Sequence, residues 1–169
     1  MREKKIRGKK RKTKQMLAFM EEATEYFPTE FYGGYWNYPL PVGQSFITSD
    51  QISFKIKRLC MQTLIDRAWH LAQQKPKGYD FCRVIAFIHR TDLWRSEIIV
   101  FKDEDYYSKF FDRNGDDYKW RRLNDERDIT RELNLLKPES FRPIGFDEFI
   151  MDEDKNEVRG EIWVVGEMD

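Results

Sequence analysis

The chain of 169 residues is long enough for one domain with a core, and 15% of its residues are aromatic, too many for a disordered chain, although 36% are charged. It has no run of about 18 apolar residues, which excludes a membrane-spanning helix, and no apolar stretch of signal-peptide length follows the N-terminus. We therefore expect a cytoplasmic protein.

The net charge is zero but unevenly distributed. Residues 1–14 hold nine Lys or Arg and one Glu, a net +8, so the remaining residues carry a net −8. This asymmetry predicts a basic N-terminal arm over residues 1–14, attached to a single domain over 15–169. The arm has no aromatic residue, so any nucleic acid would be held by its phosphates and not by its bases. The candidate polyanion-binding residues are Lys4, Lys5, Arg7, Lys9, Lys10, Arg11 and Lys12.

Two helices are expected in the N-terminal half. Apolar residues recur at spacings of three and four from about Thr13, and Pro28 ends this first helix. The second runs from about Asp50 to Gln74, with Ser49 as a plausible N-cap. The apolar positions of the first helix are Met16, Phe19, Met20, Ala23, Tyr26 and Phe27, and those of the second are Cys60, Met61, Leu64, Ile65, Ala68, Trp69, Leu71 and Ala72.

An aromatic stretch, FYGGYWNYPLP, occupies residues 31–41 between the two helices. Its glycines and prolines favour a loop, and long loops are usually either packed against the protein or functional. We expect most of its rings to be buried against the second helix and the edge of the sheet. The alternative is a partner-binding role for Trp36 and Tyr38.

The second half of the chain reads as short antiparallel strands. DFCRVIAFIHR, residues 80–90, is apolar on both faces, as in a central strand, and SEIIVFK returns from it as a hairpin. EDYYSKFF, residues 104–111, predicts a short helix, and ERDITRELNLL one or two helical turns. Further strands are expected at YKWRRL, GFDEFIM and EVRGEIWVVG. The predicted fold is α+β, with an antiparallel sheet of four to five strands and two N-terminal helices packed on one face.

Residues that carry chemistry are few. His70 reads as a solvent-facing neighbour of Asp66, four residues away. His89 ends a buried strand and is the better catalytic candidate, although a structural role is expected. Cys60 and Cys82 have no metal-ligand or redox spacing, so buried thiols are expected. No phosphate-binding, calcium-binding or hydrolase motif is present in the sequence, so we expect no cofactor and no metal.

The segments LWRSEIIVFKDEDYYSKFF, GFDEFIMDED and GEIWVVGE, with the basic start KIRGKKRKTK, resemble a family of small uncharacterised proteins from Gram-positive bacteria. The resemblance covers most of the chain and implies a bacterial cytosolic protein of unassigned role. It carries no site residue.

Three functions are compatible with these features. The favoured hypothesis is a non-catalytic binding or regulatory protein that acts through a protein partner, for instance in toxin neutralisation or another accessory role. The alternative is association with nucleic acid or the ribosome through the basic arm. The third is a hydrolase centred on His89. The sequence does not indicate an oligomeric state.

Overall fold

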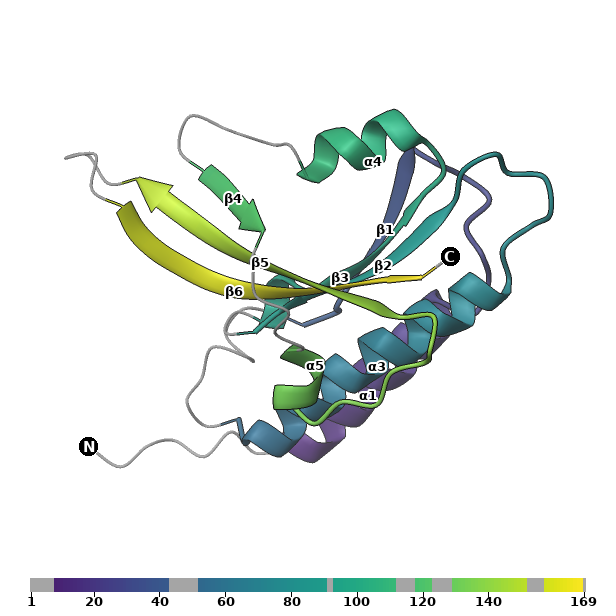
Figure 1. The fold of residues 1–169 in the computed structure, drawn as a ribbon. Helices are drawn as coiled ribbons and strands as arrows, with labels where there is room; N and C mark the ends of the chain where they lie inside the picture. Colours follow the sequence, from purple (N-terminus) through teal and green to yellow (C-terminus); the bar gives the residue numbers. More distant parts are fainter. Residues whose placement is uncertain are drawn as a thin grey trace, which may run out of the picture.

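The computed structural model describes residues 8–42, 52–90, 93–111, 118–122, 129–151 and 157–168. The fold is α+β, as predicted, and is built around an antiparallel sheet of six strands in the order β1-β3-β2-β6-β5-β4 (Figure 1). The elements are α1 (Lys9–Ala23), β1 (Tyr35–Pro39), α3 (Phe54–Gln73), β2 (Arg83–His89), the 3-10 helix η1 (Leu93–Arg95), β3 (Glu97–Phe101), α4 (Glu104–Phe111), β4 (Tyr118–Arg122), α5 (Ile129–Glu132), β5 (Arg142–Met151) and β6 (Glu157–Met168).

Strand β2 is the centre of the sheet, and its two faces belong to two separate cores. Val84, Ala86 and Ile88 join the cluster beneath α3, whereas Ile85 and Phe87 join a smaller cluster beneath α4. This alternation confirms the prediction of a central strand with apolar side chains on both faces. The hairpin to β3 is also confirmed, because β2 and β3 pair antiparallel.

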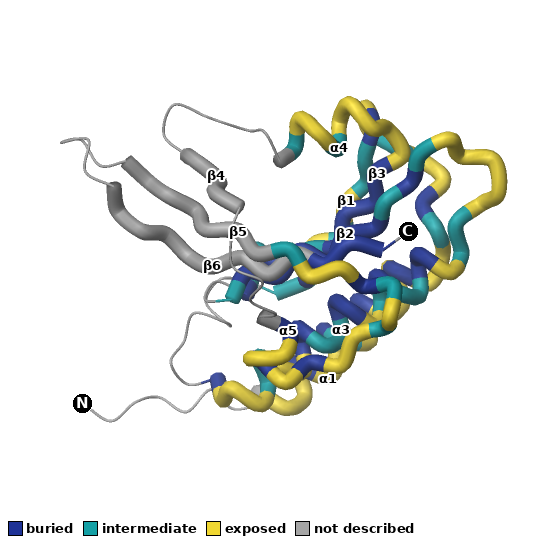
Figure 2. The backbone as a smooth tube through the Cα atoms, in the orientation of Figure 1, coloured by how far each residue is buried: buried dark blue, intermediate teal, exposed yellow. Residues whose placement is uncertain are grey.

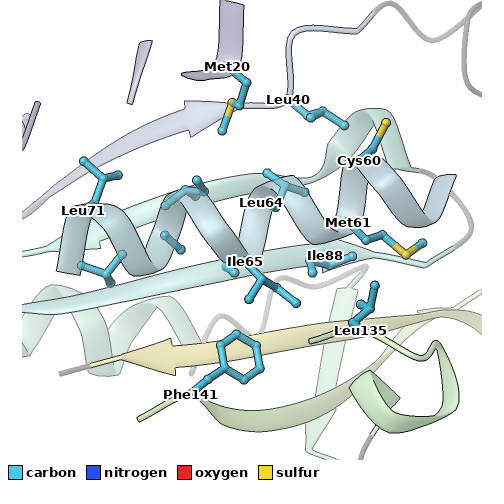
Figure 3. Packing of buried hydrophobic residues seen from close by; sticks show 14 of the residues in the cluster. Met20, Leu40, Cys60, Met61, Leu64, Ile65, Leu71, Ile88, Leu135 and Phe141 are labelled. Carbon is cyan, nitrogen blue, oxygen red and sulfur yellow. The ribbon is translucent and has the colours of Figure 1, made fainter. Parts of the chain in front are cut away.

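Helix α3 covers one face of the sheet, and its apolar stripe lies where the sequence placed it (Figure 3). Seven of the eight predicted stripe residues are buried, and the eighth, Trp69, is partly buried against the same cluster. The helix begins at Phe54, after Ser53, and so starts later than predicted. Ser49 and the rest of residues 43–51 lie outside the described residues.

Helix α1 packs beside α3, and only part of its predicted stripe is buried. Met16 and Met20 join the main core, but Phe19 and Tyr26 are 58% and 73% exposed and Ala23 is also exposed. The helix also ends at Ala23 and not at Pro28 as predicted, so Tyr26 and Phe27 lie beyond it. Figure 2 shows the exposed side of this helix layer. Met20 lies close to Leu40, just after β1, as Figure 3 shows.

The start of α1 also differs from the prediction. The helix begins at Lys9, next to Gly8, whose φ is 89°, so it starts before Thr13 and includes the second half of the basic segment. Lys4, Lys5 and Arg7 lie outside the described residues. The division of the chain into an arm and a domain stays a prediction.

The prediction that the aromatic stretch is a loop is wrong for part of it. Tyr35–Pro39 forms the edge strand β1, which pairs with β3. Pro39 is tolerated there because an edge strand does not need every backbone N–H. The turn before it requires both glycines. Gly33 has a φ of 68°, and a Cβ on Gly34 would lie 2.6 Å from the Cβ of Asp103.

Helix α4 packs on the opposite face of the sheet, at the residues predicted (Figure 1). Tyr107 and Phe110 lie against the ring of Phe101, with centroids 5.6 and 5.3 Å apart. The Asp103 side chain accepts a hydrogen bond from the Tyr106 amide at 2.8 Å, so this acid caps the helix. The sheet is therefore covered by helices on both faces.

The C-terminal strand β6 lies between β2 and β5. Strands β5 and β6 are longer than predicted, and β4 matches its prediction closely. At Gly166 the missing side chain leaves room for the Phe141 ring, which packs in the core under α3 (Figure 3). A Cβ at Gly166 would lie 1.5 Å from Phe141 Cζ, so this glycine sets how closely the segment before β5 approaches the sheet.

We predict that Gly166→Ala destabilises the protein through overpacking, by about 1–3 kcal/mol or more. The backbone conformation at this position suits alanine, so the cost comes from the Phe141 ring. Urea unfolding measures it. Phe141→Ala is destabilising by itself because it leaves a cavity, but adding Gly166→Ala to it should cost much less than in the parent. Equal costs in both backgrounds would contradict the prediction.

Candidate functional site

A groove runs along the helix layer, between α1 and the N-terminal half of α3. It begins as a hollow of about 440 Å³ and continues into one of about 610 Å³ that extends to the segment after α5. Both hollows are lined by Lys10, Ile56 and Leu59, so they form one elongated feature. We call it the α1–α3 groove. Its other lining residues are Thr13, Lys14, Leu17, Ala18, Glu21, Ser53, Lys55, Arg58, Gln62, Asn134 and Leu136.

The floor of the groove is aliphatic and open to solvent. Leu17 and Ile56 are half-buried, Leu59 is 48% exposed, and Leu136 is 79% exposed. Aliphatic side chains on a helical layer normally gain free energy by leaving water, about 25 cal/mol per Å² of apolar surface. Several of them gathered in one concave feature are typical of a contact surface for another molecule.

The rim of the groove is basic. Four of its described lining residues are cationic and exposed, namely Lys10, Lys14, Lys55 and Arg58, whereas Glu21 is the one acid in that described set. The positive charge comes from both helices, although the chain has no net charge. A ligand with acidic groups beside an apolar surface would complement the groove.

The helix dipoles add to this positive field. Near the N-terminal ends of the two helices, Lys10 of α1 lines the same hollow as Ser53 and Lys55. Beyond the other end of α1, Thr24 accepts a hydrogen bond from Arg67 of α3. The two helices therefore run parallel, with their N-terminal ends together. The first turn of neither helix contains an acid. Because helix N-termini carry partial positive charge, basic residues there are locally unfavourable. The sequence thus keeps cations where helix stability alone would favour acids.

The other end of the two helices is fixed by hydrogen bonds. Arg67 donates to both the hydroxyl and the carbonyl oxygen of Thr24 at 2.7 Å, and Gln74 donates to the carbonyl oxygen of Glu25 at 2.7 Å while accepting from the Phe27 amide at 2.9 Å. These bonds supply partners to the chain as it leaves α1. They hold α1 on α3 and keep the walls of the groove in place.

His70 belongs to this same junction. Its Nε2 lies 3.1 Å from the carbonyl oxygen of Glu25 and 2.5 Å from Gln74 Nε2. Asp66 instead accepts a hydrogen bond from Gln62 at 2.8 Å. The prediction of His70 as a solvent-facing partner of Asp66 is therefore corrected, because the end of α1 covers this part of the polar face of α3.

Gln62 fixes the far wall of the groove. Its side-chain amide donates to the carbonyl oxygen of Leu136 at 2.9 Å and accepts from the Leu136 amide at 2.8 Å. This paired contact holds the backbone after α5 against α3 and presents the Leu136 side chain outward. The exposure of Leu136 is therefore a consequence of a fixed backbone and not of a free chain end.

The structure places the predicted site residues in different surroundings. Of the predicted polyanion-binding residues, Lys10 lines the groove, and Arg11 and Lys12 are exposed on the same helix. Lys14 lines the groove too, and sequence reasoning left it out of that set. Sequence reasoning also missed the aliphatic floor, because Leu59 was not among the apolar positions assigned to the stripe of the second helix. The available signal was a leucine outside that stripe, and the structure shows it 48% exposed.

Trp36 and Tyr38, the other predicted site residues, lie together on β1 with ring centroids 6.4 Å apart. Both are half-buried, and Tyr38 packs against the main core, where burial raises the pKa of its phenol. Tyr32 stacks on Trp36 at 5.3 Å and is 71% exposed, so the prediction that most rings of this stretch are buried holds only in part. Their role in partner binding stays a prediction.

His89 is fully buried at the end of β2. Its backbone N–H donates to Ser96 Oγ at 2.9 Å. Burial, and to a smaller extent the charge of Arg95, lowers its pKa to about 3, so the ring is neutral at physiological pH. A histidine with no solvent exposure has no access to a substrate, and this geometry gives the hydrolase hypothesis no support.

A buried carboxylate ties the C-terminal strand to α4. Glu167, only 7% exposed, accepts from Arg83 Nε at 2.8 Å and from the Tyr107 hydroxyl at 2.6 Å. Burial and the Glu167 contact raise the pKa of Tyr107 to about 12, so its hydroxyl stays protonated and donates. A carboxylate satisfied in this way has a structural role.

The remaining reactive groups offer no catalytic arrangement in the described part of the chain. Cys60 and Cys82 are buried free thiols, as predicted, and burial raises the pKa of both, that of Cys60 to about 12. Such thiols are poor nucleophiles. Among the described residues no cluster of three His, Cys, Asp or Glu side chains has the geometry to hold a metal ion, and no helix is long and apolar enough to cross a membrane.

We predict that His89 makes the protein sensitive to acid. Its pKa is about 3 when folded and about 6.5 when unfolded, so the unfolded chain takes up a proton first as the pH falls. Its contribution to stability is present above pH 6.5 and is lost between pH 6.5 and 3, at up to about 1.4 kcal/mol per pH unit. Urea unfolding from pH 7 to 4 should give a shallower pH dependence for His89→Gln than for the parent. Parallel curves would contradict this.

Comparison with known proteins gives a family but no activity. No curated protein and no solved structure matches the chain. Residues 18–167 match a family described as a protein of unknown function, DUF3916, which bears out the resemblance to an uncharacterised family. The match begins within α1, so it includes the α3 wall of the groove and excludes Lys10, Lys14 and Leu17. Because the match covers most of the length of the chain, the chain belongs to the DUF3916 family.

Proposed function

We propose that the protein is a non-catalytic binding or regulatory protein that acts through a protein partner, and that the partner binds in the α1–α3 groove. The observation that supports this most is the combination of an exposed aliphatic floor, Leu59 and Leu136, with a basic rim. Protein interfaces commonly combine an apolar centre with a polar edge. A cytoplasmic location, in a bacterial cell, is part of the same proposal.

The rigid support of the groove favours binding over catalysis. Helix α3 is packed on the sheet, and hydrogen bonds from its polar side chains hold both the end of α1 and the backbone at Leu136. A surface fixed in this way needs little ordering when a partner binds, which lowers the entropic cost. Among the described residues that line the groove there is no histidine, no cysteine and no pair of carboxylates.

A toxin-neutralising role is less compatible with this surface. Toxins that attack nucleic acid are often basic, and a basic protein would be repelled by Lys10, Lys14, Lys55 and Arg58. An accessory role with an acidic partner fits the rim better. The alternative of nucleic-acid or ribosome association keeps some support, because the same cations attract phosphates.

We predict that reversing the rim charge removes the partner. Lys10→Glu with Lys14→Glu places acids in the N-terminal half of α1, where the helix dipole favours them, so the fold should be retained. Tagged parent and variant are used to capture proteins from the cells in which the protein occurs naturally. Proteins held by the parent and lost from the double variant, as identified by mass spectrometry, support the proposal.

The control is Lys77→Glu, a charge reversal at another exposed lysine, which is not among the residues that line the groove. It should capture the same proteins as the parent. Identical captured sets for the parent, the control and the double variant would contradict the groove as the binding site. If nuclease treatment releases the captured material, the nucleic-acid alternative is favoured instead.

A further inference from the structure

We infer that the occupant of the α1–α3 groove is an amphipathic acidic helix of the partner protein, an inference that rests on the function proposed above. The groove follows α1 from Lys10 to Glu21, a span of roughly 16 Å at 1.5 Å per residue. That length corresponds to about three helical turns of a bound segment. The inference therefore concerns a short helix and not a whole folded surface.

The shape of the groove favours a helix. Its α1 wall is formed by residues that recur at every third or fourth position, so the wall is the face of a helix. Two parallel helices side by side leave a valley into which the ridges of a third helix pack. An extended strand would instead need exposed backbone groups to pair with, and α1 and α3 use theirs within the helices.

The chemistry of the floor specifies the apolar face of this helix. Leu17, Ile56 and Leu59 are aliphatic, and none of the described residues that line the groove is aromatic. Aliphatic side chains complement leucine-like anchors spaced at i, i+4 and i+7. The absence of aromatic rings from this lining disfavours single-stranded nucleic acid, whose bases are held mainly by stacking.

The charge of the rim specifies the flanks of the helix. Lys10 and Lys14 lie on the α1 side, and Lys55 and Arg58 lie on the α3 side. A helix seated on the floor would present its flanking positions to both pairs of cations. Acids at those positions would gain charge complementarity, and they would also offset the unfavourable cations near the two helix N-termini.

Three labelled peptides of about 15 residues test the inference against the full-length protein by fluorescence anisotropy. The first carries leucines at every third or fourth position among glutamates. The second has the same composition with leucine and glutamate alternating where possible, which destroys the helical face. The third replaces every glutamate of the first by lysine. We expect the first peptide to bind at least about tenfold more tightly than the other two, a difference of about 1.4 kcal/mol.

Variants assign the binding to the groove. Lys14→Glu and Leu136→Gln should each weaken binding of the first peptide about fivefold or more, and Lys77→Glu should leave it unchanged. Leu136 is 79% exposed, so its substitution tests the floor without a cost to folding, which circular dichroism checks. A first peptide that binds no better than the second or third overturns the inference.

A single-stranded RNA oligomer is the competing probe. If it binds more tightly than the first peptide and Lys14→Glu weakens it equally, the inference is overturned in favour of nucleic acid. The peptides could fail to bind while the capture experiment still shows a protein that is held by the parent and lost from the Lys10→Glu, Lys14→Glu double variant. That result would overturn the acidic-helix inference and leave the proposed function standing. Failure of both experiments removes the proposed function as well.

Discussion

The packing of α3 on the central strands of the sheet is the interaction on which the rest of the structure depends. Leu64, Ile65 and Leu71 are completely buried there, and so are Val84, Ala86 and Ile88 of β2, which belong to the same cluster. One face of α3 packs on the sheet, and α1 packs beside the helix. Polar side chains of α3 form hydrogen bonds with Thr24 and with the backbone of Leu136. The α1–α3 groove lies where these two helices run side by side.

Sequence reasoning found the elements that periodicity specifies. The stripe of α3, the alternation in β2 and the short helix α4 were predicted at nearly the right residues, because each buries a complete repeat of apolar positions. It failed at β1, where Gly33 and Pro39 suggested a loop. Both are accommodated by tertiary context, since Gly33 forms the turn before the strand and Pro39 ends an edge strand.

The candidate site was only partly predictable for a related reason. The basic residues were evident as a cluster, but their helical conformation from Lys9 onward was not, since cations and Gly8 give no start signal for a helix. Leu59 and Leu136 lie 77 positions apart in the sequence and share one hollow. The paired hydrogen bonds of Gln62 with the Leu136 backbone bring them together, and no local pattern announces such a contact.

Strand β1 limits how the protein meets other chains at this edge of the sheet. The N–H and carbonyl groups of Tyr35 are already bonded to Tyr32, and Pro39 has no N–H to give. By the alternation of an antiparallel ladder, Trp36 and Tyr38 direct theirs toward β3, so within β1 only Asn37 offers an outward donor and acceptor. One such position is too few to recruit a strand from another molecule. The backbone of β1 thereby disfavours open-ended stacking of copies through this edge, the first step of many aggregation routes.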